Sequence, residues 1–248
     1  MKTTPLGAGL IAVALIVGPA AAQEATWTGE GSFGAGTTTG NTDTTDYGLG
    51  LKLAREAGPW AVTLEAIGEY AETNGVENKN RMFFAGQADR DFSERMYGFG
   101  RASWEQDEFS GFESRAFAGI GVGYRLLTGE RTTWAVELAP GVKFDEVRQT
   151  VLPGPVVVPA YSDTGVSVIG ASRFAHPFND NVKLTNDTTV TWADTSTQID
   201  NRLAVTAALG GALSARFSYN VRHDTDPPFG FEATDTATRV SLVYAFGE

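Results

Sequence analysis

Fourteen acidic and basic residues recur on one side of the alternating apolar and polar pattern that fills most of this chain. They are Asp46, Lys52, Glu65, Glu69, Asp89, Arg115, Arg125, Glu137, Lys143, Lys183, Asp187, Arg202, Arg216 and Arg239. Charged side chains that line an enclosed space can select which solutes pass through it. The same side chains can instead pair with opposite charges and fill that space. The sequence leaves both interpretations open: a narrow solute passage and a closed interior.

Two histidines raise the question of catalysis, because a lipid hydrolase in a membrane needs a serine nucleophile beside a histidine base. His176 precedes a proline in a predicted short turn, and His223 follows a predicted strand at the outer rim. The outward residues beside His223 on neighbouring predicted strands are asparagine and threonine, while outward Ser114 and Ser172 lie on non-adjacent strands. We therefore predict that the protein is not an enzyme, with no catalytic residue and no cofactor.

Acidic residues in the predicted outer loops could hold calcium or magnesium, which prefer carboxylate oxygens. These residues are Asp43, Glu72, Glu77, Asp107, Glu108, Asp163, Asp194, Asp224, Asp226 and Asp235. Such ions could bridge the loops to lipopolysaccharide phosphates. No loop has the regular ligand spacing of a dedicated calcium site. The sequence therefore predicts solvated loops and no metal site.

The segment Trp134–Phe144 shows the pattern that must position the charged residues. Its even positions are Trp134, Val136, Leu138, Pro140, Val142 and Phe144, and its odd positions are Ala135, Glu137, Ala139, Gly141 and Lys143. Successive side chains of a strand point to opposite faces, so one face is apolar and the other is polar. Repeated along an exported chain, this pattern is typical of a transmembrane antiparallel up-and-down β-barrel.

About twelve such strands can be placed, an even number as expected of single-chain bacterial barrels. They span residues 27–36, 44–54, 60–71, 80–90, 96–105, 113–126, 132–145, 164–174, 182–193, 199–209, 213–222 and 236–246. In the fifth, Tyr97 and Phe99 share a face with Arg101, which predicts a bulge. Short turns alternate with connections that are mostly longer and more polar, so that both termini are expected in the periplasm.

The N-terminal residues predict export, and the composition limits the possible partners. Residues 1–22 combine a lysine, an apolar run and three alanines, which indicates a signal peptide followed by a barrel domain at residues 23–248. The chain has no cysteine, which excludes disulfides and thiolate metal sites. A net charge of −11 argues against a nucleic-acid partner.

Aromatic residues favour a membrane barrel over a soluble β-sandwich, which would also alternate. Trp60 and Tyr70 share one face, ten residues apart, as do Trp134 and Phe144. That separation spans about 25 Å, the height of a lipid-facing band between two aromatic girdles. The last strand ends at Phe246 and resembles the signal read by the outer-membrane assembly machinery, although two residues follow it.

The loop Glu146–Asp163 is the longest connection, and its middle is apolar and rich in proline. Loops of this length usually have a function of their own. It could fold inward as a constriction or serve as a docking surface. Alternatively, it rests against the barrel rim without a specific role.

Three segments resemble a known family. They are Trp27–Gly36 with the following Thr-Gly-Asn-Thr at 39–42, Trp104–Phe112, and Gly119–Arg125. This combination is similar to the YdiY-like family, whose members are described as salt-induced outer-membrane proteins and whose domain has no established function. The resemblance is strongest from Trp27 to about Asp145. It implies a fold and a location in the cell outer membrane, and it supplies no functional residue.

Together these observations predict a monomeric outer-membrane barrel that contacts membrane lipids and lipopolysaccharide. Its expected role is a narrow solute passage or a structural component of the envelope. Two alternatives remain from other classes: an outer-membrane lipid hydrolase and an adhesive barrel that acts through its surface loops.

Overall fold

The computed structural model describes residues 25–41, 43–129, 131–152 and 156–247. The predicted signal peptide, residues 1–22, lies outside these described residues and stays a prediction. The strands are β1 (Thr26–Thr39), β2 (Thr44–Ala57), β3 (Trp60–Thr73), β4 (Val76–Asp91), β5 (Met96–Asp107), β6 (Phe112–Thr128), β7 (Thr133–Val147), β8 (Thr150–Leu152), β9 (Val156–Val158), β10 (Tyr161–Asn179), β11 (Val182–Ala193), β12 (Thr197–Gly210), β13 (Leu213–Asp224) and β14 (Thr234–Phe246). Within the described residues no helix is long and apolar enough to cross a bilayer.

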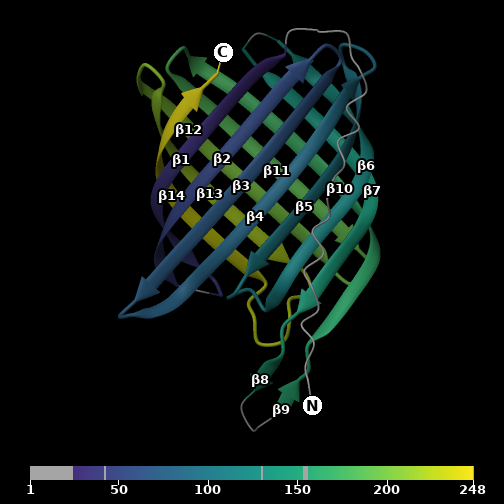
Figure 1. Ribbon diagram of the computed structural model, residues 1–248, viewed down its shortest axis with the longest axis vertical. Helices are drawn as coiled ribbons and strands as arrows, with labels where there is room; N and C mark the ends of the chain where they lie inside the picture. Colours follow the sequence, from purple (N-terminus) through teal and green to yellow (C-terminus); the bar gives the residue numbers. More distant parts are fainter. Residues whose placement is uncertain (1–24, 42, 130, 153–155, 248) are drawn as a thin grey trace.

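Twelve of these strands form one closed antiparallel barrel, as predicted (Figure 1). Each strand pairs with its neighbour along the barrel, and β1 closes the ring against β14 from Gly29↔Phe246 to Thr39↔Thr236. β1 begins and β14 ends at the same rim, at the top of Figure 1. Because the termini of such barrels are expected in the periplasm, we call that rim the periplasmic rim and the opposite one the outer rim.

The two faces of the barrel wall separate as the alternation predicts. On the outer face Leu49 is 64% exposed and Ile120 is 74% exposed, as expected of side chains that contact acyl chains. On the inner face Asp46 and Ser167 are fully buried. An apolar residue thus lies on the outer surface while a carboxylate lies inside, the reverse of a soluble domain.

The aromatic residues that predicted the lipid band all lie on the outer face. Trp60, Tyr70, Trp134 and Phe144 are between 39% and 50% exposed. Tyr244 and Phe246 of the closing strand are also outward, and their rings stack with centroids 6.5 Å apart. The band therefore continues across the seam between β14 and β1.

The predicted bulge in the fifth strand is wrong. β5 pairs regularly with β4 from Arg81↔Asp107 to Asp91↔Tyr97, without a register shift. Tyr97 and Phe99 share the inner face with Arg101 because both rings are buried inside the barrel, where each is 5% exposed. Aromatic residues on the polar side of the alternation were the cause of the error.

Most connections are shorter than expected, and two of them are much shorter. β3 and β4 join at the outer rim through Asn74-Gly75 alone, and both residues have positive φ angles, 55° and 78°. Asn-Gly is the preferred pair for such a two-residue hairpin, because glycine and asparagine tolerate this conformation. The predicted turn Ala175–Asn181, which holds His176, is mostly strand: β10 continues to Asn179, with its register shift between Pro177 and Asn179. A proline lacks an N–H group and so suggests a strand end, yet it is tolerated at such an irregularity.

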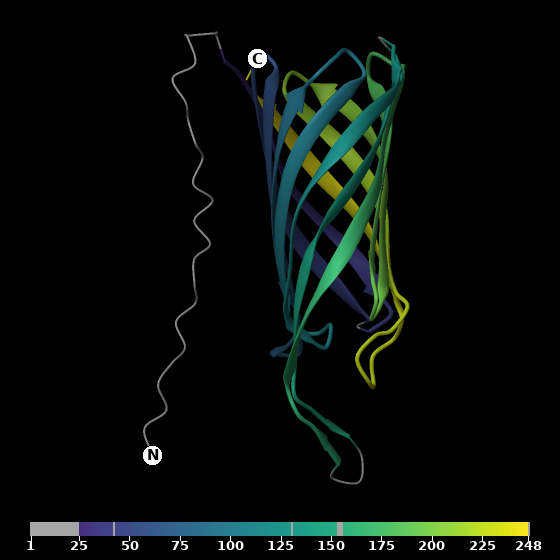
Figure 2. The same cartoon turned by 90° about the vertical axis from the view of Figure 1, so that its right-hand side faces the viewer.

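The long loop Glu146–Asp163 carries a small hairpin that the sequence pattern did not predict. β8 pairs with β9 from Thr150↔Val158 to Leu152↔Val156, and the residues between them, 153–155, lie outside the described part of the chain. The hairpin extends beyond the outer rim in line with β7 and β10 (Figure 2). It projects away from the barrel, so the described part of the loop does not fold inward as a constriction.

The fold makes a prediction for the lipid-facing surface. Leu51 lies near the middle of β2 and is 43% exposed on the outer face. The substitution Leu51→Arg should lower the free energy of unfolding by about 2–4 kcal/mol, because it places a charge in the acyl region. Urea unfolding of the protein folded into lipid vesicles measures this change.

The matched control is Thr185→Arg on the cavity wall. It adds the same side chain to the polar interior and should cost clearly less than Leu51→Arg, because the side chain stays in contact with water and not with acyl chains. Equal losses in the two variants would contradict the assignment of the two faces.

Candidate functional site

The interior of the barrel holds one long cavity of about 700 Å³. Its lining reaches from Asn41, Ser110 and Asp235 near the outer rim to Lys183 and Thr206 near the periplasmic rim. Ten of the fourteen residues predicted to face the interior line it: Lys52, Glu65, Glu69, Arg115, Lys143, Lys183, Asp187, Arg202, Arg216 and Arg239. The alternation along twelve strands therefore brings together residues from almost the whole chain.

The other four predicted residues lie outside this cavity lining. Asp46 is fully buried behind Arg239. Asp89 accepts a hydrogen bond from Gln87 Nε2 at 2.9 Å, and the same amide nitrogen donates to Glu137 Oε1 at 2.9 Å. Arg125 lies toward the periplasmic rim, where its Nη2 contacts Asp91 Oδ1 at 2.7 Å.

The outer part of the interior contains a connected set of ion pairs, which we call the buried lattice. Its members are Asp46, Glu69, Lys79, Arg81, Glu105, Arg222 and Arg239. Arg239 contacts Asp46 through Nη2 and Glu69 Oε1 through Nη1, the latter at 2.6 Å. Lys79 Nζ lies 3.3 Å from Glu69 Oε2 and donates to Thr38 Oγ1 at 2.7 Å. Two buried carboxylates thus share two cations.

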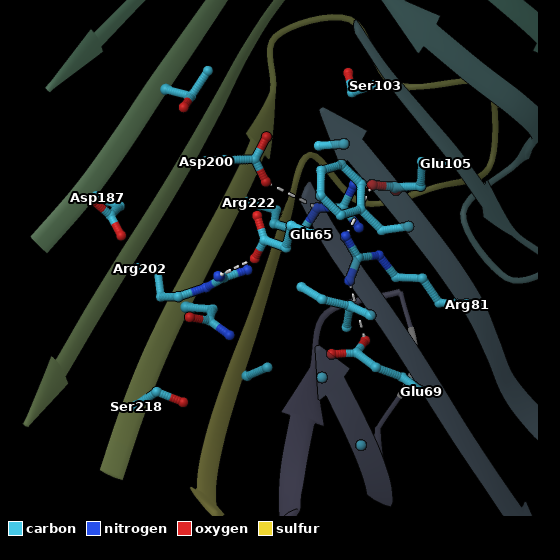
Figure 3. A pocket seen from close by; sticks show the side chains of 18 of the residues that line it. Glu65, Glu69, Arg81, Ser103, Glu105, Asp187, Asp200, Arg202, Ser218 and Arg222 are labelled. Atoms are coloured by element: carbon cyan, nitrogen blue, oxygen red, sulfur yellow. Dashed lines mark hydrogen bonds and ion pairs between the residues drawn. The ribbon is translucent and has the colours of Figure 1, made fainter. Parts of the chain in front are cut away.

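Arg81 joins this group to a second carboxylate centre. Its Nη1 lies 3.5 Å from Glu69 Oε2, and its Nη2 lies 2.9 Å from Glu105 Oε2. Glu105 also binds Arg222, whose Nε lies 3.2 Å from Asp200 Oδ1 (Figure 3). Buried charges are costly unless they are paired, so each member of the lattice depends on its partners.

Four of the ion pairs cross the lumen; the longest is Arg222–Asp107, from β13 to β5, at 3.8 Å. Arg222 on β13 meets Glu105 on β5, Arg115 on β6 meets Asp224 on β13, and Arg202 on β12 meets Glu65 on β3. The paired strands are five or six places apart in the ring of twelve, so these contacts span the barrel from wall to wall. The N–O distances are 2.8 Å for Arg115–Asp224 and 2.9 Å for Arg202–Glu65. These pairs act as bars across the interior.

Several members of the lattice were absent from the fourteen predicted residues, although the pattern contained a signal for most of them. Arg81 has the inward parity of Asp89 on the fourth strand, and Arg222 has that of Arg216 on the eleventh. Glu105 has the parity of Arg101, but the expected bulge obscured the inward face of that strand. Lys79 fell in a predicted loop because the strand begins four residues earlier than expected.

On one side of the lumen a group of apolar residues fills the interior; we call it the aromatic shelf. It consists of Tyr97, Phe99, Phe117, Ala139, Ile169 and Ala171 from the neighbouring strands β5, β6, β7 and β10. The Tyr97 hydroxyl donates to Glu137 Oε1 at 2.9 Å, so its polar end is satisfied. Arg125 lies over the Tyr97 ring with its Cζ 4.7 Å from the centroid.

Glycines on the wall make room for the shelf. A Cβ at Gly123 would overlap the Tyr97 ring, and a Cβ at Gly141 would lie 2.5 Å from Phe117 Cζ. Real Cβ atoms do not approach other atoms so closely, so larger residues here would displace the rings. The small residues of β6 and β7 therefore fit an interior that is filled on this side.

The cavity wall is enriched in positive charge relative to the whole chain. Twelve of the 19 lysines and arginines line the cavity, compared with nine of the 30 acidic residues. The chain as a whole has a net charge of −11. The lining therefore has the opposite sign to the chain that forms it.

The two histidines bond to threonines on neighbouring strand ends. His223 Nδ1 lies 2.8 Å from Thr234 Oγ1, and its register partners are Thr234 and Ile199. His176 Nδ1 lies 2.8 Å from Thr132 Oγ1. Among the described residues, no three His, Asp or Glu side chains are arranged to hold a metal ion.

The buried lattice makes a prediction about stability. Asp46→Asn removes a fully buried carboxylate that serves Arg239 and Lys79. The two cations would then share Glu69 alone, so the free energy of unfolding should fall by about 3–5 kcal/mol. Denaturant unfolding in vesicles, followed by tryptophan fluorescence, gives the value.

Asp91→Asn is the same chemical change at an exposed ion pair, because the Asp91 side chain is 44% exposed beside Arg125. It should cost no more than about 1 kcal/mol. If both variants lost the same small amount, the lattice would not contribute to stability as argued.

The sequence and the fold also match known proteins. An uncharacterised protein of Escherichia coli (strain K12), YdiY, is 24% identical over 219 residues, which is 87% of this chain and 82% of that protein. The NanC porin has a similar structure, with a TM-score of 0.54 and 9% identity over 86% of this chain and 98% of that one. The translocator domain of the autotransporter NalP from Neisseria meningitidis has a TM-score of 0.50 and 12% identity, covering 90% and 88% of the two chains.

At these identities the two structures show the fold alone, that of an outer-membrane barrel. The family resemblance based on Trp27–Gly36, Trp104–Phe112 and Gly119–Arg125 is confirmed by a match to the sequence profile of a family over residues 31–246. The chain therefore belongs to the family described as "Protein of unknown function, DUF481", and it has the closed twelve-stranded fold of outer-membrane barrels.

Proposed function

We propose that this barrel is a narrow passage for small solutes across the outer membrane, working as a monomer and without catalysis. The observation that carries the proposal is the cavity of about 700 Å³, whose lining extends from Asn41 and Asp235 at the outer end to Lys183 and Thr206 at the periplasmic end. A barrel with only a structural role needs no interior space along its length.

The interior is narrow because two features reduce its cross-section. The aromatic shelf occupies the side formed by β5, β6, β7 and β10. The remaining space lies on the side of β1 to β3 and β11 to β13, and the cross-lumen ion pairs divide it. A twelve-stranded barrel is intermediate between small filled barrels and wide porins, so such filling decides what can pass.

The pair Arg202–Glu65 is the best candidate for a bar that can open. It lies near the middle of both strands, and its side chains are 42% and 28% exposed, in contrast to the buried lattice. Ion pairs in contact with water contribute at most about 1 kcal/mol, so thermal motion opens them readily. The cavity lining continues past the Arg222–Glu105 bar to Asn41 and Asp235, so solutes would pass beside that buried bar and through the middle when Arg202–Glu65 separates.

A monomer in the outer membrane fits the closed ring and its surroundings. All twelve barrel strands come from one chain, and the outer face carries apolar and aromatic residues on each part of the ring. We infer contacts with acyl chains and lipopolysaccharide, and insertion by the assembly machinery through β14. Salt-dependent expression, which the family resemblance implied, stays a prediction.

We infer a non-catalytic role, because movement of a solute through the lumen requires no nucleophile. The hydrolase alternative depended on His223, whose ring bonds to Thr234 and faces Ile199 on the other side. A threonine at the start of β14 beside a histidine is a weaker nucleophilic arrangement than a serine with an oxyanion hole.

The passage proposal predicts an effect of removing the central bar. The double substitution Glu65→Gln and Arg202→Gln removes both partners of the ion pair, so neither charge is left without the other. Single-channel conductance of the purified protein in planar bilayers should rise, because the middle of the lumen widens.

The control is Glu146→Gln, since Glu146 bonds to Ser114 on the outer surface and is not part of the cavity lining. Its conductance should equal that of the unmodified protein. Absence of discrete conductance in the unmodified protein over a range of salt concentrations would overturn the proposal.

A second candidate function, adhesion, is favoured by the projecting hairpin. Val151 and Val157 on β8 and β9 are 65% and 52% exposed beyond the outer rim. Deleting residues 151–160 should leave conductance unchanged if the barrel is only a passage. Loss of cell attachment with intact conductance would instead support the adhesive role.

A further inference from the structure

The inner part of the cavity, away from the buried lattice, gathers basic side chains that have few acidic partners. We call Lys52, Arg101, Arg173 and Lys183 the inner cationic belt; all four line the cavity. They come from β2, β5, β10 and β11, and they therefore face one another from different parts of the wall. Lys183 is the second residue of β11, next to the periplasmic rim.

Three members of the belt have no ion pair with any described residue: Lys52, Arg101 and Lys183. The Nε of Arg101 is buried and has no hydrogen-bond partner among the described atoms. Arg173 reaches Glu137 only at 3.9 Å and donates to Thr189 Oγ1 at 3.3 Å. Lys52, Arg101 and Lys183 thus line the cavity with no carboxylate within ion-pair distance among the described residues.

The nearby carboxylates offset these cations only in part, because arginines outside the belt bind two of them, Glu30 and Glu65. Both carboxylates still lie within electrostatic range of Lys52. Arg216 contacts both oxygens of Glu30, at 2.9 and 2.8 Å, and Arg202 contacts Glu65 at 2.9 Å. Glu137 is held by the Tyr97 hydroxyl and by Gln87. Asp187 is the remaining acid on this wall, and its register partners are Arg173 and Arg202. The balance of charge in this part of the lumen is positive.

Arg101 and Arg173 also lie within electrostatic range of each other, and Glu137, Glu65 and Asp200 lie within range of Arg101. Two guanidinium groups that face the same space repel each other, and the repulsion is stronger where water is limited. An anion between them removes this repulsion and satisfies their free N–H groups. Guanidinium groups bind carboxylates and phosphates in a two-pronged geometry, whereas an ammonium group acts as a point charge.

We propose that the inner cationic belt is a binding site for small organic anions that carry carboxylate or phosphate groups. The inference rests on the proposed function in that it names the class of solute the passage favours. The cavity volume of about 700 Å³ is within the range of small-molecule sites, so a compact anion fits between the walls. Two lysines and two arginines supply the contacts, and the cross-lumen pair Arg202–Glu65 and the wall pair Arg216–Glu30 line the same cavity.

The test compares the unmodified protein with the triple variant Lys52→Gln, Arg101→Gln and Lys183→Gln. Isothermal titration calorimetry of the folded protein in detergent, with citrate and with inorganic phosphate as separate probes, measures binding. Affinity for at least one probe should fall roughly tenfold or more in the variant, because three positive charges near the ligand are lost. The comparison of citrate with phosphate distinguishes a carboxylate site from a phosphate site.

The second measurement is the reversal potential in planar bilayers under a potassium chloride gradient. The unmodified protein should favour chloride over potassium, and the triple variant should lose this preference. The matched control is Arg55→Gln with Arg90→Gln, which removes positive charge from outward positions where these residues lie over Trp27 and Trp60. That variant should keep both the affinity and the preference for chloride.

The outcomes separate the two proposals. Anion binding that depends on the belt, in a protein without conductance, would keep the binding site and overturn the passage. Conductance without anion preference, together with equal affinity in the unmodified protein and the triple variant, would overturn the binding site and keep the passage. Circular dichroism of the triple variant verifies that it is folded.

Discussion

Closure of the hydrogen-bonded ring is the constraint on which the rest of this structure depends. Acyl chains offer no partner to a backbone N–H or C=O group, so an open sheet edge cannot lie in the membrane. The pairing of β1 with β14 from Gly29 to Thr39 removes both edges. Once the ring is closed, every second side chain faces an enclosed interior. The charged residues of the strands must then lie inside, where they meet partners from distant parts of the chain.

Burying charged side chains inside the barrel costs free energy, and the outer and inner parts of the lumen offset this cost in different ways. In the outer part, Asp46, Glu69 and Glu105 are each paired with basic side chains. These ion pairs make the wall rigid and leave little room for solutes there. In the inner part, the acids are already bound and basic side chains remain. An enclosed charge without a partner is costly unless water or a counter-ion reaches it. A cavity that admits water and anions is therefore the condition under which Lys52 and Arg101 can stay charged.

The alternation predicted the strands and their faces because that signal is local: it depends on residues two positions apart. It could not predict which inward residues meet. Arg222 and Glu105 are 117 residues apart, and Arg202 and Glu65 are 137 apart. Their contact is set by strand tilt and stagger added over half the ring, which no local pattern contains. The same limit explains Tyr97 and Phe99, since an apolar residue on the polar face gives no indication that it packs against Phe117 and Ile169 inside the barrel.

Porins and an autotransporter translocator share this fold, so the fold does not select the function and the interior must. The aromatic shelf is informative here because its glycines are matched to its rings. A Cβ at Gly123 would meet Tyr97, and one at Gly141 would meet Phe117. Rings that pack by chance would not require residues without side chains on two neighbouring strands. The sequence therefore specifies the partial filling of the lumen. It also specifies the remaining space, whose lining has more basic than acidic side chains.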